Sequence, residues 1–167
     1  LQRIPEAMSA ALPVAAVLGL GLLLGTHSLY EWSHAGVVRL DELLQQKSAW
    51  LNPTGFAVRL VVAFVIWIAC SRRLVSLGRR VEAGEPGAVQ RRAATAALFL
   101  ALFAVTFSIA SFDWLMSIDF KFFSTMWGVY FFAGSAYVGT ATLILILALL
   151  RRAGKMEGAV TSEHFHD

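Results

Sequence analysis

The chain has 167 residues, of which 57% are hydrophobic and 15% are charged, and its mean hydropathy is +0.65. Soluble domains carry roughly 25% charged residues, so this composition predicts a membrane protein, with residues 1–167 forming one domain. The net charge of +3 does not indicate a nucleic-acid partner, because the basic residues gather in short stretches between apolar runs. The single cysteine, Cys70, excludes an internal disulfide, and no cysteine motif for c-type haem or an iron–sulfur centre is present.

Four apolar segments predict an all-α integral membrane fold in which four transmembrane helices form a bundle. Each segment is near the roughly 20 residues that a helix needs to span a bilayer. The segments are continuous rather than alternating, which favours helices over a β-barrel. In chain order they lie at about residues 12–29, 54–71, 93–112 and 125–150.

The arginines between these segments predict the orientation of the chain. Six arginines lie in the connection at residues 72–92, and Arg151, Arg152 and Lys155 follow the last helix. Because positively charged loops stay in the cytoplasm, we expect both ends of the chain on that side. The connections at residues 31–53 and 113–124 then face outward. In the first of these, apolar residues recur at helical spacing over Val37–Leu51, which fits either a short helix on the membrane surface or a packed loop.

Charged and titratable residues gather near the predicted outer side. His27 lies near the outer end of the first helix, with Glu31 one turn later, and Arg59 lies about five residues into the second helix. Asp113 ends the third helix. Asp119 and Lys121 follow it in the link to the fourth.

Ionisable residues within or beside membrane helices are functional candidates by default. A quinol site needs a hydrogen-bond acceptor that takes a proton, and an arginine partner can hold a carboxylate ionised. The candidates for a proton-linked or quinone-linked role are therefore Asp113, Arg59, His27 and Glu31. Structural roles remain open, because Arg59 can also serve only to neutralise Asp113 or Glu31 in an ion pair inside the bundle. No residue is assigned as catalytic.

Aromatic residues at the same boundary fit an interfacial belt. They are Tyr30, Trp32, Trp50, Trp114, Phe122 and Trp127. His27 is the one histidine predicted inside the membrane, which argues against a bis-histidine haem. His164 and His166 near the end of the chain make a weak metal motif, so no metal is predicted.

Five segments carry a resemblance to a known family. They are LYEWSH (Leu29 to His34), KSAWLN with FAVR (Lys47 to Asn52, Phe56 to Arg59), FDWLMS (Phe112 to Ser117), FFSTMWGVYFFAGS (Phe122 to Ser135) and TSEHFHD (Thr161 to Asp167). Across most of its length the chain resembles the F subunit, ActF, of bacterial alternative complex III, a quinol:cytochrome c or quinol:electron-acceptor oxidoreductase. That subunit is similar to the NrfD/PsrC membrane anchors.

The resemblance implies a multi-pass subunit of the bacterial inner membrane, surrounded by lipid and without a redox centre of its own. The implied partners are an iron–sulfur subunit, a multihaem cytochrome c that carries haem c, and the related C subunit. Bound quinone is possible, whereas nucleic acid is not implied. Family members continue beyond both ends of this sequence, so the chain would be a central fragment covering about helices three to six.

Three functions follow as hypotheses. The first is a subunit that contributes to quinone interaction or proton movement at the outer side, and the second is a purely structural anchor of the same complex. The third is a proton-conducting or transporter-like protein. For the third, Thr106, Ser108 and Ser111 either hold waters along the third helix or bond back to their own helix carbonyls.

Overall fold

The computed structural model describes residues 3–153, and within this range the fold is all α with no strand. Four helices are long and apolar enough to cross a membrane, which confirms the predicted multi-pass bundle. They are α2 (Leu12–Leu29), α5 (Pro53–Glu82), α6 (Ala88–Trp114) and α7 (Trp127–Arg152). Lys155, the paired histidines and the segment TSEHFHD lie outside the described residues.

The short elements lie before α2 or at the turns between the long helices. A short helix of seven residues precedes α2, and two short helices replace the single helix proposed for residues 37–51. The chain breaks at Asp41, which has an extended backbone and caps the second short helix by accepting a hydrogen bond from Leu44 N at 3.1 Å. The short elements are α1 (Arg3–Ser9), η1 (Glu31–Ser33), α3 (Ala35–Leu40), α4 (Glu42–Lys47) and η2 (Met116–Ile118).

Local sequence signals fix where α5 begins. Asn52 has an extended backbone, and its side-chain oxygen accepts a hydrogen bond from Gly55 N at 2.7 Å. Pro53 occupies the first helical turn, where the N–H that it lacks would have no helical partner. This cap sets the start of the helix that carries Arg59.

The connection predicted at residues 72–92 is mostly helical. The α5 helix continues to Glu82 and α6 begins at Ala88, so only residues 83–87 form the turn. Gly84 and Gly87 have φ angles of 72° and 73°, in the left-handed region that glycine adopts without strain. The helices run past the apolar segments because arginine is a good helix former, so loss of hydrophobicity does not end a helix.

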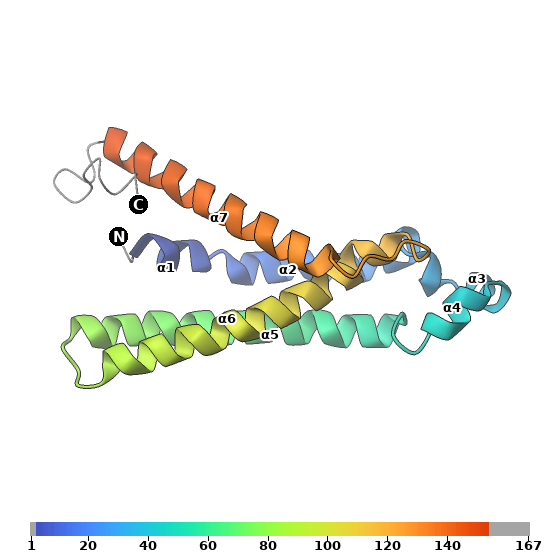
Figure 1. The fold of residues 1–167 in the computed structure, drawn as a ribbon, viewed down its shortest axis with the longest axis horizontal. Coiled ribbons are helices and arrows are strands. Elements are labelled where there is room, and N and C mark those ends of the chain that lie inside the picture. The colour runs from blue at the N-terminus through green and yellow to red at the C-terminus, as the bar shows by residue number, and fades with distance from the viewer. Residues whose placement is uncertain (1–2, 154–167) are drawn as a thin grey trace.

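The long helices pack in chain order as antiparallel neighbours, α2 on α5, α5 on α6 and α6 on α7 (Figure 1). One end of the assembly holds the turns that contain η1, α3, α4 and η2, and the opposite end holds the arginine-rich turn between α5 and α6. The α7 helix diverges from α6 with distance from residue 127 (Figure 1).

The hydrophobic core lies toward the end that holds the short helices. Tyr30 and Trp32 are 1% and 3% exposed there, and they pack in this core against Phe56. The prediction that both belong to an interfacial belt is therefore wrong, because the chain turns inward after α2 and places these rings between the helices. Trp50 and Phe122 remain 48% and 44% exposed.

Candidate functional site

Arg59 and Asp113 form a two-pronged ion pair between α5 and α6. Arg59 Nε lies 2.5 Å from Asp113 Oδ2, and Arg59 Nη2 lies 3.2 Å from Asp113 Oδ1. The Asp113 side chain is 2% exposed and that of Arg59 is 19% exposed. The structure thus selects Asp113 as the partner of Arg59 from the two acidic residues that the sequence left open.

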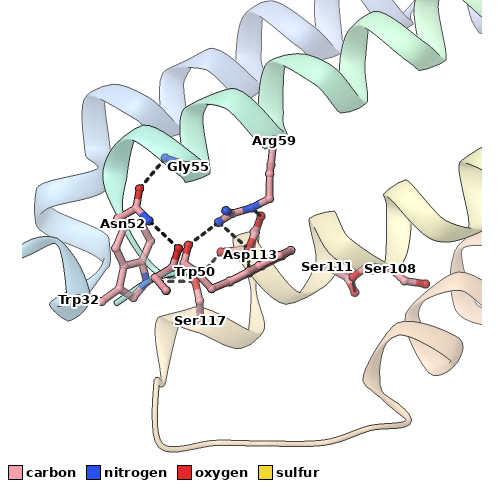
Figure 2. Close-up of polar contacts among 10 residues, drawn as sticks. Trp32, Trp50, Asn52, Gly55, Arg59, Ser108, Ser111, Asp113 and Ser117 are labelled. Carbon is pink, nitrogen blue, oxygen red and sulfur yellow. Dashed lines mark hydrogen bonds and ion pairs between the residues drawn. The ribbon is translucent and has the colours of Figure 1, made fainter. Parts of the chain in front are cut away.

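Trp50, in the turn before α5, completes this pair (Figure 2). Its indole Nε1 donates to Asp113 Oδ1 at 2.9 Å, and its carbonyl oxygen accepts a hydrogen bond from Arg59 Nη2 at 2.9 Å. The Arg59 guanidinium carbon also lies 4.2 Å from the centre of the Trp50 ring, within range of a cation–π contact. We name Trp50, Arg59 and Asp113 the Asp113 cluster.

The sequence interpretation missed the role of Trp50. It placed this residue in the aromatic belt, although the indole N–H is a donor that needs an acceptor. The usable signal was the position of Trp50 just before the Asn52–Pro53 helix start. That position holds it within a few residues of Arg59.

Side chains from η1 and η2 hold the end of α6, where the last helical carbonyls lack helical partners. Ser117 Oγ donates to the Asp113 carbonyl oxygen at 2.5 Å, and Trp32 Nε1 donates to Ser117 Oγ at 3.2 Å. Tyr30 donates its hydroxyl proton to the Trp114 carbonyl oxygen at 2.9 Å. These bonds fix the backbone that carries the Asp113 carboxylate.

Tyr30 lies just after α2, outside the membrane-spanning helices. Burial raises the pKa of its phenol from 10.0 to about 12, and the negative charge of Asp113 adds to the increase. Tyr30 therefore stays a neutral hydrogen-bond donor over the physiological range.

A small pocket of about 140 Å³ opens between α5 and α6 beside the Asp113 cluster. The lining residues with polar groups are Thr106, Asp113, Trp114 and Arg59. The remaining lining is aliphatic and comes from Val58, Val62, Ala63, Ile109 and Ala110. The accessible lining of the pocket is thus almost wholly apolar, although the buried Asp113 cluster lies at its wall.

The Asp113 carboxylate retains room for one more hydrogen bond. An ionised carboxylate offers about four acceptor positions on its two oxygens. Three of these are used, because Oδ1 accepts from Trp50 and Arg59 while Oδ2 accepts from Arg59 alone. One acceptor position on Oδ2 is therefore unused within the described residues.

The other sequence candidates share this end of the bundle but do not join the cluster. His27 is exposed, stacks on His34 with 3.9 Å between ring centroids, and lies 3.3 Å from Ser33 Oγ through Nδ1. Glu31 is exposed in η1, because the backbone leaves the helix at Tyr30. It therefore does not continue the helical face of His27.

Asp119 and Lys121 belong to the exposed turn between α6 and α7. Asp119 Oδ1 accepts a hydrogen bond from the Lys121 backbone N–H at 3.0 Å, which shapes the turn. Both residues are exposed, as expected for charges in a solvated link.

The hydroxyl groups along α6 bond back to their own helix. Thr106 Oγ1 and Ser108 Oγ each donate at 2.7 Å to the carbonyl four residues earlier, and Ser111 Oγ donates at 2.7 Å to Ser108 O. Thr106 also accepts from Trp67 Nε1 at 2.8 Å. The hydroxyl protons are thus committed to backbone carbonyls, which gives no support to a water-filled proton path along this helix.

Within the described part of the chain, no group of three or more His, Cys, Asp or Glu side chains is placed to hold a metal ion. Comparison with known proteins found no matching family model and no matching curated protein.

Proposed function

We propose that this chain is an integral membrane subunit of a bacterial respiratory quinol oxidoreductase, of the kind to which the F subunit of alternative complex III belongs. In this proposal it lies in the inner membrane with the arginine-rich turn in the cytoplasm and the Asp113 cluster at the outer side. Partner subunits carry the iron–sulfur and haem centres, and this chain contributes to quinone interaction beside Asp113.

The observation that carries the proposal is the pocket between α5 and α6. An apolar cavity of about 150 Å³ is known to hold benzene, so 140 Å³ offers space for one six-membered ring. A quinol head group is such a ring with hydroxyl donors, and the open acceptor position on Asp113 Oδ2 suits one of them. The aliphatic lining from α5 and α6 suits the rest of the ring.

The assembled complex with Asp113→Asn tests this role. The substitution keeps the shape of the side chain but removes its charge and its capacity to take a proton. We expect the quinol oxidation rate per assembled complex to fall on the order of 100-fold, at the low end of what a positioned proton acceptor contributes. Asp119→Asn is the matched control, because it removes the same charge from the exposed turn of the same end, and it should leave the rate unchanged.

A purely structural anchor is the second candidate, and the completeness of the Asp113 cluster favours it. Every buried side-chain polar atom in the described residues has a hydrogen-bond partner, and the carboxylate is clamped by Arg59 and Trp50. For an anchor, Asp113→Asn lowers the yield or thermal stability of the complex, whereas the oxidation rate per assembled complex stays at the original value. That outcome would reject the quinone role.

A further inference from the structure

A second pocket lies at the opposite end of the bundle, between α1 and the arginine-rich half of α5. Its volume is about 660 Å³, and both α1 and the start of α2 contribute to its walls. At roughly 30 Å³ per water molecule, this space would hold about twenty waters. It therefore has room for a group much larger than a single inorganic ion.

Two arginines of α5, Arg72 and Arg79, line this pocket. Arg72 and Arg79 are separated by two helical turns, and Ser76 lies between them on the same face of α5. Within residues 3–153, neither arginine side chain makes a hydrogen bond or an ion pair. The polar wall thus presents two positive charges with unused N–H donors.

The one acidic residue of the lining is already neutralised. Glu6 on α1 accepts a hydrogen bond from Arg92 Nη2 on α6 at 3.0 Å. Glu6 also packs closely on Gly78 of α5, where an added Cβ would lie 2.5 Å from its Oε1. The Glu6–Arg92 pair fixes α1 beside α5 and leaves the charge of the pocket positive.

The part of the lining nearer the middle of the bundle is apolar. Leu12 and Pro13 begin α2, while Ile68 lies within the apolar part of α5. A soluble anion would gain nothing from this wall. A phospholipid places a charged phosphate at the membrane surface and its acyl chain next to it in the hydrocarbon, which matches the order of arginines and aliphatic side chains.

We propose that this pocket binds an anionic phospholipid, with its phosphate between Arg72 and Arg79 and its first acyl carbons against Leu12, Pro13 and Ile68. Basic pockets between membrane helices bind anionic lipid head groups in this way. The proposal is independent of the quinone role, because it concerns the other end of the bundle.

The test is native mass spectrometry of the full protein, extracted from its membrane in mild detergent and titrated with phosphatidylglycerol. The variant carrying Arg72→Gln and Arg79→Gln should bind phosphatidylglycerol about 10- to 30-fold more weakly. The matched control carries Arg73→Gln and Arg80→Gln. It removes the same number of charges from exposed neighbours on the same helix and should bind as the original protein does.

Three outcomes would overturn the proposal. Equal weakening in both double variants would mean that general positive charge attracts the lipid. Equal binding of phosphatidylcholine would mean that the pocket does not select an anionic head group. Displacement of the lipid by millimolar inorganic phosphate would assign the arginines to a soluble anion. The variant with Arg72→Lys and Arg79→Lys should retain most of the binding, which would show that charge rather than folding is affected.

Discussion

At the scale of single residues, Asp113 is the one charged residue that is buried within the described part of the chain. Breaking a buried ion pair by removing one partner costs about 3–5 kcal/mol, because the other charge stays buried. A well-packed apolar pair at the same place is often equally stable, so stability alone does not call for a buried pair. The additional clamp by Trp50 suits a structural role, whereas the open acceptor position on Oδ2 is the feature that suits the proposed ligand.

Tyr30 provides a pH-dependent prediction. Its pKa rises from 10.0 to about 12 in the folded protein, so the native state holds the phenol proton more tightly than the unfolded chain does. The contribution of this proton to stability is fully present below pH 10 and is lost as the pH rises toward 12. The difference in near-ultraviolet phenolate absorbance between the protein and Tyr30→Phe should have its midpoint near pH 12.

The same titration can also contradict the burial of Tyr30. A midpoint near pH 10 would show that Tyr30 is solvated, and the buried hydrogen bond to the Trp114 carbonyl would then be wrong. The second readout is the resistance of the protein to alkaline unfolding, compared with that of Tyr30→Phe. The variant has no phenol proton at this position, so it cannot lose the stability that this proton contributes.

At the scale of elements, the crossing of α6 and α7 depends on Gly128. An added Cβ there would lie 2.8 Å from Ser108 Cβ and 3.2 Å from the Phe112 ring, whereas at Gly134 on the same helix it would meet nothing within 4 Å. We expect Gly128→Ala to destabilise the protein by about 1–3 kcal/mol through overpacking. Gly134→Ala should leave it equally or slightly more stable, because alanine favours the helix.

Thermal unfolding in detergent micelles checks this pair of variants. Equal melting temperatures for Gly128→Ala and Gly134→Ala would contradict the close approach of α6 and α7. A lower melting temperature for Gly128→Ala alone would support the close approach of α6 and α7. It would also locate their contact near the Asp113 end of α6.

The sequence predicts the helices better than their ends. Apolar length alone identifies α2, α5, α6 and α7, since no other element within residues 3–153 is long and apolar enough to cross a bilayer. It does not locate the end of α5, because the arginines that leave the membrane remain good helix formers. The break between α3 and α4 depends on the single side-chain cap of Asp41, which a periodic apolar pattern hides.

The sequence predicts how far along the helices the residues of the candidate site lie. It does not predict which of these residues contact each other. Helix ends predict that His27, Arg59 and Asp113 lie at one side of the membrane, and in the structure they lie at one end of the bundle. Which of them meet depends on the rotation and packing of α5 against α6, and the sequence pattern does not contain this information. Trp50 was missed for the same reason, because its contact with Asp113 joins residues 63 positions apart.

At the scale of the whole molecule, the two ends of the bundle have different chemistry. One end holds the Asp113 cluster and a pocket the size of one ring, and the other holds arginines around a larger pocket. Large apolar side chains on all four long helices are exposed, including Leu24, Val65, Leu100 and Tyr137, as expected for surfaces that face lipid or further membrane helices. The proposed orientation places quinone chemistry and anionic lipid on opposite sides of the membrane.

The most direct test of the quinone proposal is photolabelling of the assembled complex with a light-activated quinone, followed by peptide mapping. We expect the label on α5 and α6 at residues that line the pocket, such as Val62 and Ile109, and we expect excess unlabelled quinol to prevent it. Label found only on a partner subunit, or on the lipid-facing sides of these helices without competition, would contradict a quinone site beside Asp113.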